Sequence, residues 1–142
     1  MISVRYLCLV LAFVVLPSTV YGCSCRRPTI EGSLCRNNAV FLKVKVTGLT
    51  NDGNDYLLNV WKVFNGPRDL QDKSMTLYAN RNSGSLCGLE NLYVNNVYYL
   101  DATYNSNAET LSAGLCNFHR HERHLTDEDV QAVVDSTTCE KP

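Results

Sequence analysis

The sequence predicts a small, mainly β protein: a five-stranded OB-like barrel with flanking short helices and three disulfides. Five short segments have the composition of strands, and two of them, 40–49 and 74–79, alternate apolar and polar residues in the pattern of strands that bury one face. No segment repeats, and one clear helix pattern comes late in the chain, which favours a closed or nearly closed barrel. A β-sandwich fits the strand pattern almost as well.

The first predicted strand, residues 40–49, alternates apolar side chains with lysine and threonine. Asp52 and Gly53 follow in a dense turn sequence that favours a tight hairpin. The return strand, 56–64, contains Trp61, the single tryptophan. The other predicted strands are 74–79, 96–104 and 109–116.

Two helical passages are expected to flank the strands. Residues 28–38 form a short irregular or helical passage. Thr126 precedes three acidic residues, which is typical of a helix cap and a first turn that favours negative charge. Val130, Val133 and Val134 then give that helix an apolar side.

Residues 1–22 have the pattern of a secretory signal peptide. Arg5 gives a positive start, residues 7–16 are apolar throughout, and Gly22 offers a small residue at the cleavage site. The apolar run is too short to span a membrane, and no second one follows. We therefore expect one secreted domain, residues 23–142, in the extracellular space or matrix.

The composition of the mature chain excludes some partners. Without Arg5, 12 basic side chains stand against 14 acidic ones, which argues against nucleic acid. Cys8 leaves with the signal peptide, so six of seven cysteines remain, an even number suited to an oxidising compartment. Six cysteines allow 15 pairings, and sequence alone does not choose among them. We expect a monomer.

Cleavage after Gly22 would make Cys23 the first residue, with a free α-amino group close to its own backbone carbonyl. An amine and a carbonyl on one immobilised residue form a five-membered chelate for a metal ion. Ser24 and Cys25 complete a Cys-Ser-Cys sequence, which in secreted domains is usually two disulfide halves and nothing more. Only its position at the cleavage site, together with the register of the other cysteines, favours metal binding over that interpretation.

The mature chain resembles the N-terminal, netrin-like (NTR) domain of the tissue inhibitors of metalloproteinases (TIMPs). Six cysteines in the family's order, the first created by signal cleavage, make the resemblance fairly specific. The six further cysteines of the family's C-terminal domain are absent from this sequence. The matching residues are Cys23-Ser24-Cys25, Cys35, Phe64-Asn65-Gly66, Ser85-Leu86-Cys87-Gly88, Cys116-Asn117-Phe118 and Cys139.

The resemblance implies an inhibitor of secreted zinc metalloendopeptidases of the matrix metalloproteinase type. In such enzymes three protein ligands hold the zinc, and water takes the fourth position. The amine and carbonyl of Cys23 would displace that water, so the zinc belongs to the target and the inhibitor has no cofactor of its own. The implied disulfides are Cys23–Cys87, Cys25–Cys116 and Cys35–Cys139.

The resemblance also implies a protease-binding surface. Ser24 would enter the specificity pocket beside the zinc, and Arg26 and Arg27 would continue along the cleft. Arg27 stands where the family commonly has proline. Residues 84–86, held beside Cys23 by its disulfide, would occupy the other side. The implied set is Cys23, Ser24, Cys25, Arg26, Arg27, Gly84, Ser85 and Leu86.

The alternative function is a netrin-like extracellular binding module without a protease target, for matrix or a receptor. Modules of that kind share the scaffold but have no exposed first cysteine. The mature N-terminus therefore separates the two hypotheses. An enzyme is not expected, because Ser24 and Ser85 have no histidine in a recognisable triad.

A histidine cluster near the end of the chain suggests a zinc site of the protein's own. The metalloprotease motif needs two histidines four residues apart with a glutamate after the first. His121 and Glu122 begin such a motif, but position 125 is leucine. We expect His119, His121 and His124 to lie in a solvated loop, and the tyrosine-rich segment before it to be a half-buried strand.

Overall fold

The computed structural model describes residues 23–81 and 87–139. The predicted signal peptide and the site residues Gly84, Ser85 and Leu86 lie outside these ranges. No helix within them is long and apolar enough to cross a membrane. The elements are α2 (Ile30–Leu34), β1 (Ala39–Leu49), β2 (Tyr56–Asn65), η1 (Arg68–Leu70), β3 (Ser74–Tyr78), β4 (Val97–Asn105), β5 (Thr110–Ser112), β6 (His119–His121), η2 (Glu122–His124) and α3 (Asp127–Ser136).

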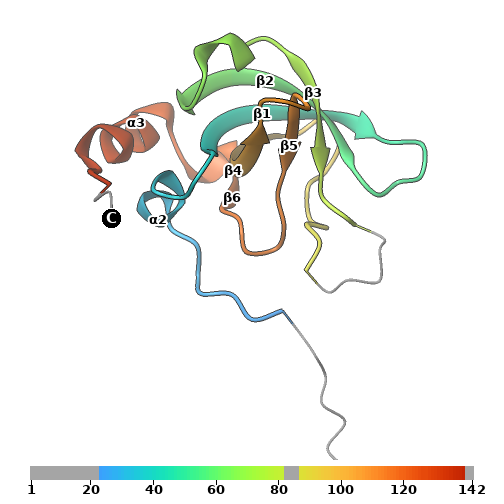
Figure 1. Cartoon of the computed structure of the whole chain (residues 1–142), viewed down its shortest axis with the longest axis horizontal. Coiled ribbons are helices and arrows are strands. Elements are labelled where there is room, and N and C mark those ends of the chain that lie inside the picture. Colours follow the sequence, from blue (N-terminus) through green and yellow to red (C-terminus); the bar gives the residue numbers. More distant parts are fainter. Residues whose placement is uncertain (1–22, 82–86, 140–142) are drawn as a thin grey trace, which may run out of the picture.

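Five strands form a closed barrel (Figure 1). Strands β1, β2, β3, β5 and β4 are neighbours in that order, and β1 also pairs with β4, which closes the sheet. Strands β3 and β5 run parallel, while the other pairs are antiparallel. The predicted OB-like barrel is confirmed, and closure through β1 and β4 rules out the sandwich.

The alternation of β1 fills the inside of the barrel. Val40, Leu42, Val44 and Val46 are at most 2% exposed, as the sequence predicts. They pack with apolar side chains of every other barrel strand, including Leu111 of the short β5. Burial of this apolar surface stabilises the barrel by about 25 cal/mol per Å².

A second apolar cluster lies outside the barrel, under the two helices. Phe41 faces away from the barrel interior, and its ring centroid lies 6.3 Å from that of Phe64 and 5.5 Å from that of Phe118. Ile30 of α2 and Val130 of α3 pack on the same cluster. Figure 1 shows α2 and α3 together at this side of the barrel.

Polar contacts fix the start of α3. The Thr126 side chain accepts a hydrogen bond from the backbone N–H of Asp129, which confirms the predicted cap. Asp127 accepts hydrogen bonds from the Tyr99 hydroxyl at 2.6 Å and the Lys43 ammonium at 3.0 Å. Burial opposes ionisation of Asp127, but these bonds leave its pKa below the usual value. Burial, and then the bond to Asp127, raise the pKa of Tyr99.

The turn between β1 and β2 spans residues 50–55, which are the residues that the predicted strands 40–49 and 56–64 leave between them. It is longer than the tight hairpin that Asp52 and Gly53 favour. Asp52 accepts hydrogen bonds from the Thr50 hydroxyl at 2.7 Å and the Asn54 backbone N–H at 3.0 Å. These side-chain bonds stabilise a longer loop, with Gly53 at a φ of 72°. The bonds from Thr50 and Asn54 also lower the pKa of Asp52.

The end of the sheet also differs from expectation. The predicted strand 109–116 is reduced to β5, and the expected solvated loop contains strand β6, which pairs with β4 so that His121 lies opposite Tyr98. Strand β1 occupies one edge of β4, so β5 and β6 share the other edge. Strand β4 is therefore more than half-buried: residues 97–102 are all buried.

Candidate functional site

Both cysteines of the Cys-Ser-Cys sequence are joined to distant parts of the chain. The disulfides are Cys23–Cys87, Cys25–Cys116 and Cys35–Cys139, with Cα–Cα distances of 5.4, 5.3 and 5.3 Å. These are the pairs that the resemblance implies. The first two close loops of 64 and 91 residues, each worth on the order of 4 kcal/mol in the entropic model. Three disulfides are typical of an extracellular or otherwise oxidising environment.

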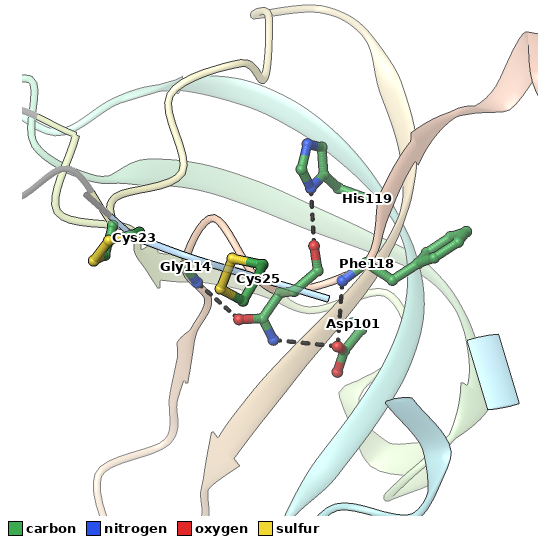
Figure 2. The surroundings of a disulfide bond; sticks show 9 residues. Cys23, Cys25, Asp101, Gly114, Phe118 and His119 are labelled. Atoms are coloured by element: carbon green, nitrogen blue, oxygen red, sulfur yellow. Dashed lines mark hydrogen bonds between the residues drawn. A yellow bond between two sulfur atoms is a disulfide. The ribbon is translucent and has the colours of Figure 1, made fainter. Parts of the chain in front are cut away.

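The two segments that receive the N-terminal disulfides are bonded to each other. The backbone N–H of Leu115 donates to the carbonyl oxygen of Cys87 at 2.9 Å, and Gly88 forms a β-bridge with Gly114. A Cβ atom on Gly114 would lie 2.9 Å from the same carbonyl oxygen, so this approach requires glycine. Figure 2 shows both N-terminal cysteines beside Gly114. The two disulfides thus attach to one connected unit.

The turn between β1 and β2 supports the Cys87 side of this unit. The Asp55 carboxylate accepts hydrogen bonds from the backbone N–H groups of Ala79 at 2.8 Å and Asn80 at 3.3 Å. A Cβ atom on Gly88 would lie 2.3 Å from the carbonyl oxygen of Asn80. The residue after Cys87 therefore packs directly on backbone that Asp55 holds in place.

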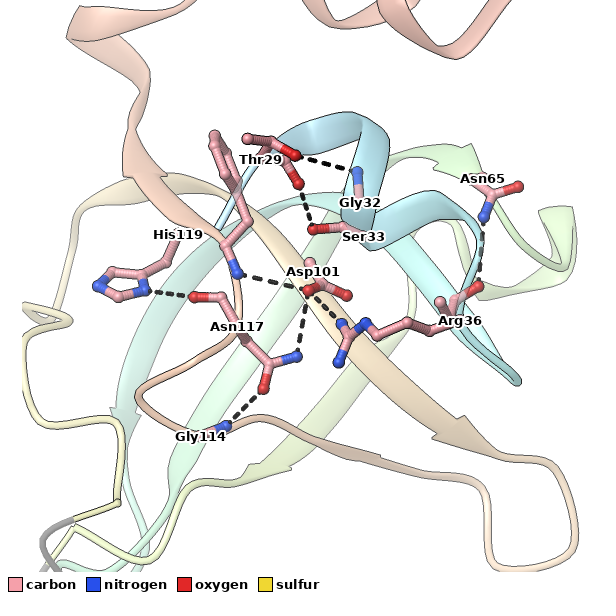
Figure 3. A network of polar contacts seen from close by, with 11 residues as sticks. Thr29, Gly32, Ser33, Arg36, Asn65, Asp101, Gly114, Asn117 and His119 are labelled. Atoms are coloured by element: carbon pink, nitrogen blue, oxygen red, sulfur yellow. Dashed lines mark hydrogen bonds and ion pairs between the residues drawn. The ribbon is translucent and has the colours of Figure 1, made fainter. Parts of the chain in front are cut away.

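A buried polar network holds the Cys116 side (Figure 3). Asp101 of β4 is 1% exposed and lies between the stretches of β4 that pair with β5 and β6. One of its carboxylate oxygens pairs with Arg36 and accepts hydrogen bonds from the Asn117 side chain at 3.2 Å and the Phe118 backbone N–H at 3.4 Å. The Asn117 side-chain oxygen accepts from the Gly114 backbone N–H at 2.8 Å. The network fixes the backbone on both sides of the disulfide-bonded cysteine.

Residues 24–28 run from this unit toward α2 without regular secondary structure (Figure 1). Within the described ranges, their backbone N–H and C=O groups make no hydrogen bond to other backbone groups. Ser24, Arg26 and Arg27 are exposed, while Cys25 and Pro28 are half-buried. Unpaired backbone groups of this kind are available to a binding partner.

The structure thus brings together the N-terminal part of the predicted site, and it does not describe the other part. Cys23 to Arg27 form one continuous surface segment. Gly84, Ser85 and Leu86 lie outside the described residues, and their neighbour Cys87 is the closest residue that is placed. Sequence reasoning missed Asp101, whose signal was an acidic residue within an apolar strand, since a buried charge requires partners.

The histidines make contacts within the protein. The described ranges hold no group of three or more histidine, cysteine, aspartate or glutamate side chains placed to bind a metal ion. His121 Nε2 lies 2.9 Å from the Asn96 side-chain oxygen, and its Nδ1 accepts from the Arg123 backbone N–H at 3.1 Å. His119 Nδ1 lies 3.0 Å from the carbonyl oxygen of Asn117.

Comparison of the chain with models of known protein families finds no match, and no curated protein shows significant similarity to it. The resemblance to the TIMP family therefore rests on the order of the cysteines and the short motifs around them.

Proposed function

We propose that the protein is a secreted inhibitor of zinc metalloendopeptidases and not an enzyme. Residues 23–142 would be its inhibitory netrin-like domain after removal of a signal peptide. The α-amine and carbonyl oxygen of Cys23 bind the catalytic zinc of the target and displace the water that acts as nucleophile. The amine must be neutral to coordinate, and its ordinary pKa is about 7.7–8, so binding releases a proton near neutral pH.

One observation carries this proposal. The segment that begins at Cys23 is anchored at residues 23 and 25 to a single connected unit, while the backbone of residues 24–28 stays unpaired within the described ranges. A protease cleft binds its substrate as an extended chain through such backbone groups, in the manner of strand addition. Because the inhibitor's segment is already immobilised, little conformational entropy is lost on binding.

The side chains then have separate roles in the proposal. Ser24 enters the specificity pocket beside the zinc. Arg26 and Arg27 continue along the cleft. Residues 84–86 are assigned to the opposite side of the cleft, because their neighbour Cys87 is bonded to Cys23.

The proposal is tested by adding one alanine ahead of Cys23. The new residue moves the terminal amine by roughly 3.8 Å, one Cα–Cα step, and leaves the disulfides unchanged. Inhibition of a matrix metalloproteinase panel should fall by more than about 100-fold, since even outer-shell partners of a metal contribute about 10–100-fold. The thermal unfolding midpoint should not change.

The control is the parent protein, whose N-terminus is verified by mass spectrometry to be Cys23. Equal inhibition by the parent and the extended protein would show that the chelation mechanism is wrong. A natural N-terminus ahead of Cys23, together with no inhibition by either form, would favour the netrin-like binding module instead.

A further inference from the structure

A groove of about 640 Å³ lies between the N-terminal segment and helix α2. Arg26, Arg27 and Arg36 line the groove. Asp101 of β4 and Cys116 also contribute to its lining. Figure 3 shows Arg36 reaching from the chain after α2 to Asp101.

The charge of this groove differs from that of the whole protein. Among the described residues, its lining contains three arginines and a single acidic residue, Asp101, which is already paired with Arg36. Arg26 and Arg27 are exposed, and neither takes part in an ion pair among the described residues. The mature chain, in contrast, has 12 basic and 14 acidic side chains. Two uncompensated positive charges therefore stand in one groove of an acidic protein.

We propose that this groove binds an acidic peptide segment, with aspartate or glutamate side chains on the arginines. Guanidinium groups bind carboxylates with two parallel hydrogen bonds, so they suit such a ligand better than lysines would. A peptide is favoured over a small free anion because the backbone of residues 24–28 borders the groove, makes no backbone hydrogen bond among the described residues, and can pair with an extended chain.

The source of the acidic segment is the rim of the target protease; this step rests on the proposed function. A protease whose zinc is bound by Cys23 must lie over the residues that follow, and Arg26 and Arg27 belong both to that segment and to the groove. The groove would then select targets with acidic side chains beside the cleft, since an unpaired charge buried at an interface weakens binding.

The test measures peptide binding without any protease. Fluorescein-labelled hexaglutamate is titrated with the mature protein, and anisotropy is compared with that of labelled hexaglutamine. The double variant Arg26→Gln/Arg27→Gln should bind hexaglutamate about fivefold more weakly, as expected for two exposed ion pairs. The matched control is Arg68→Gln/Arg123→Gln, which removes two exposed arginines without ion pairs elsewhere on the described surface and should bind like the parent.

Two results would overturn the inference. Equal binding by the parent and the Arg26/Arg27 variant, or equal weakening in the control, would reduce it to general charge attraction. Displacement of the peptide by sulfate much more effectively than by chloride at equal ionic strength would assign the groove to a free oxyanion instead.

An inhibition assay on the same samples separates this inference from the proposed function. A protein that inhibits proteases but does not bind hexaglutamate overturns the groove assignment alone. A protein that binds hexaglutamate through Arg26 and Arg27 but inhibits no protease supports the acidic-peptide site and removes the protease as its source.

Discussion

Replacing Asp101 by alanine should destabilise the protein more than any exposed acidic substitution. The carboxylate of Asp101 is the acceptor at the centre of the network on both sides of Cys116. Alanine removes this acceptor and leaves the backbone hydrogen bond from Asp101 N–H to the Phe118 carbonyl oxygen, at 2.9 Å, unaffected. The experiment therefore isolates the side-chain network.

The magnitude follows from the donors left without a partner. The Asn117 side-chain N–H and the Phe118 N–H are buried, and an unpaired buried donor costs about 1–3 kcal/mol. The hydrogen bond from the Phe118 N–H is long, at 3.4 Å, so its loss should cost an amount near the lower end of this range. The Arg36 side chain is 44% exposed and can be hydrated. The variant also no longer pays the desolvation penalty of a buried carboxylate, which offsets part of this cost. We therefore expect the free energy of unfolding to fall by about 2–3 kcal/mol.

Urea denaturation of the oxidised protein, followed by circular dichroism, measures this change. Asp101→Asn keeps one oxygen acceptor and should recover most of the loss. The matched control is Asp69→Ala, whose side chain is 71% exposed and lies 3.7 Å from Lys73; it should cost less than about 0.5 kcal/mol. A loss below about 1 kcal/mol for Asp101→Ala would refute the argument that the network holds this part of the fold.

Three further outcomes are expected. Gly88→Ala places a Cβ atom 2.3 Å from a backbone oxygen, so it should lower the free energy of unfolding by about 1–3 kcal/mol and weaken inhibition. The control Gly48→Ala, whose Cβ atom would have its nearest neighbour at 3.7 Å, should change neither stability nor inhibition. Similar unfolding midpoints for the two variants would contradict this. Arg27→Pro should broaden the range of inhibited proteases in a panel assay, because proline fixes the backbone before binding; unchanged selectivity would mean that this side chain points into solvent. Because the folded-state pKa of Asp127 is lowered, its contribution to stability is present above about pH 4 and is lost as the pH falls through the folded-state pKa. Tyr99→Phe removes one of the bonds that lower this pKa, so the variant should lose less stability than the parent between about pH 6 and about pH 3, as measured by urea unfolding. An equal loss of stability in the variant and the parent would contradict this.

The barrel could be predicted because its long strands carry their own periodicity. In β1, apolar residues occupy every second position from Val40 to Val46, which predicts the inward face, although Phe41 between them is also apolar and faces outward. Strand β6 has only three residues, two of them histidines, and it exists because β4 offers an unpaired stretch of edge opposite Tyr98. The residue pattern of β6 alone does not show that the edge of β4, which is distant in the sequence, is available for pairing.

The part of the site that could be predicted is the part defined by disulfide bonds. The cysteines carried the resemblance, and the resemblance implied their pairs, which spacing alone did not determine. The supporting contacts were missed because each depends on tertiary placement: Asp55 binds backbone N–H groups 24 and 25 residues away, and Gly88 matters only because Asn80 lies against it. Sequence patterns describe neighbours along the chain, and these residues are neighbours only in space.

The two disulfides at Cys23 and Cys25 also have a mechanical consequence. A chain end attached at one point can swivel about that bond, whereas attachment at two points removes the rotation. The points are two residues apart, and the hydrogen bond between Leu115 and Cys87 holds the receiving segments at a fixed spacing. Reduction of either disulfide would leave the N-terminal segment attached at one point and free to rotate, so the segment would stay bound to the domain but lose its fixed orientation.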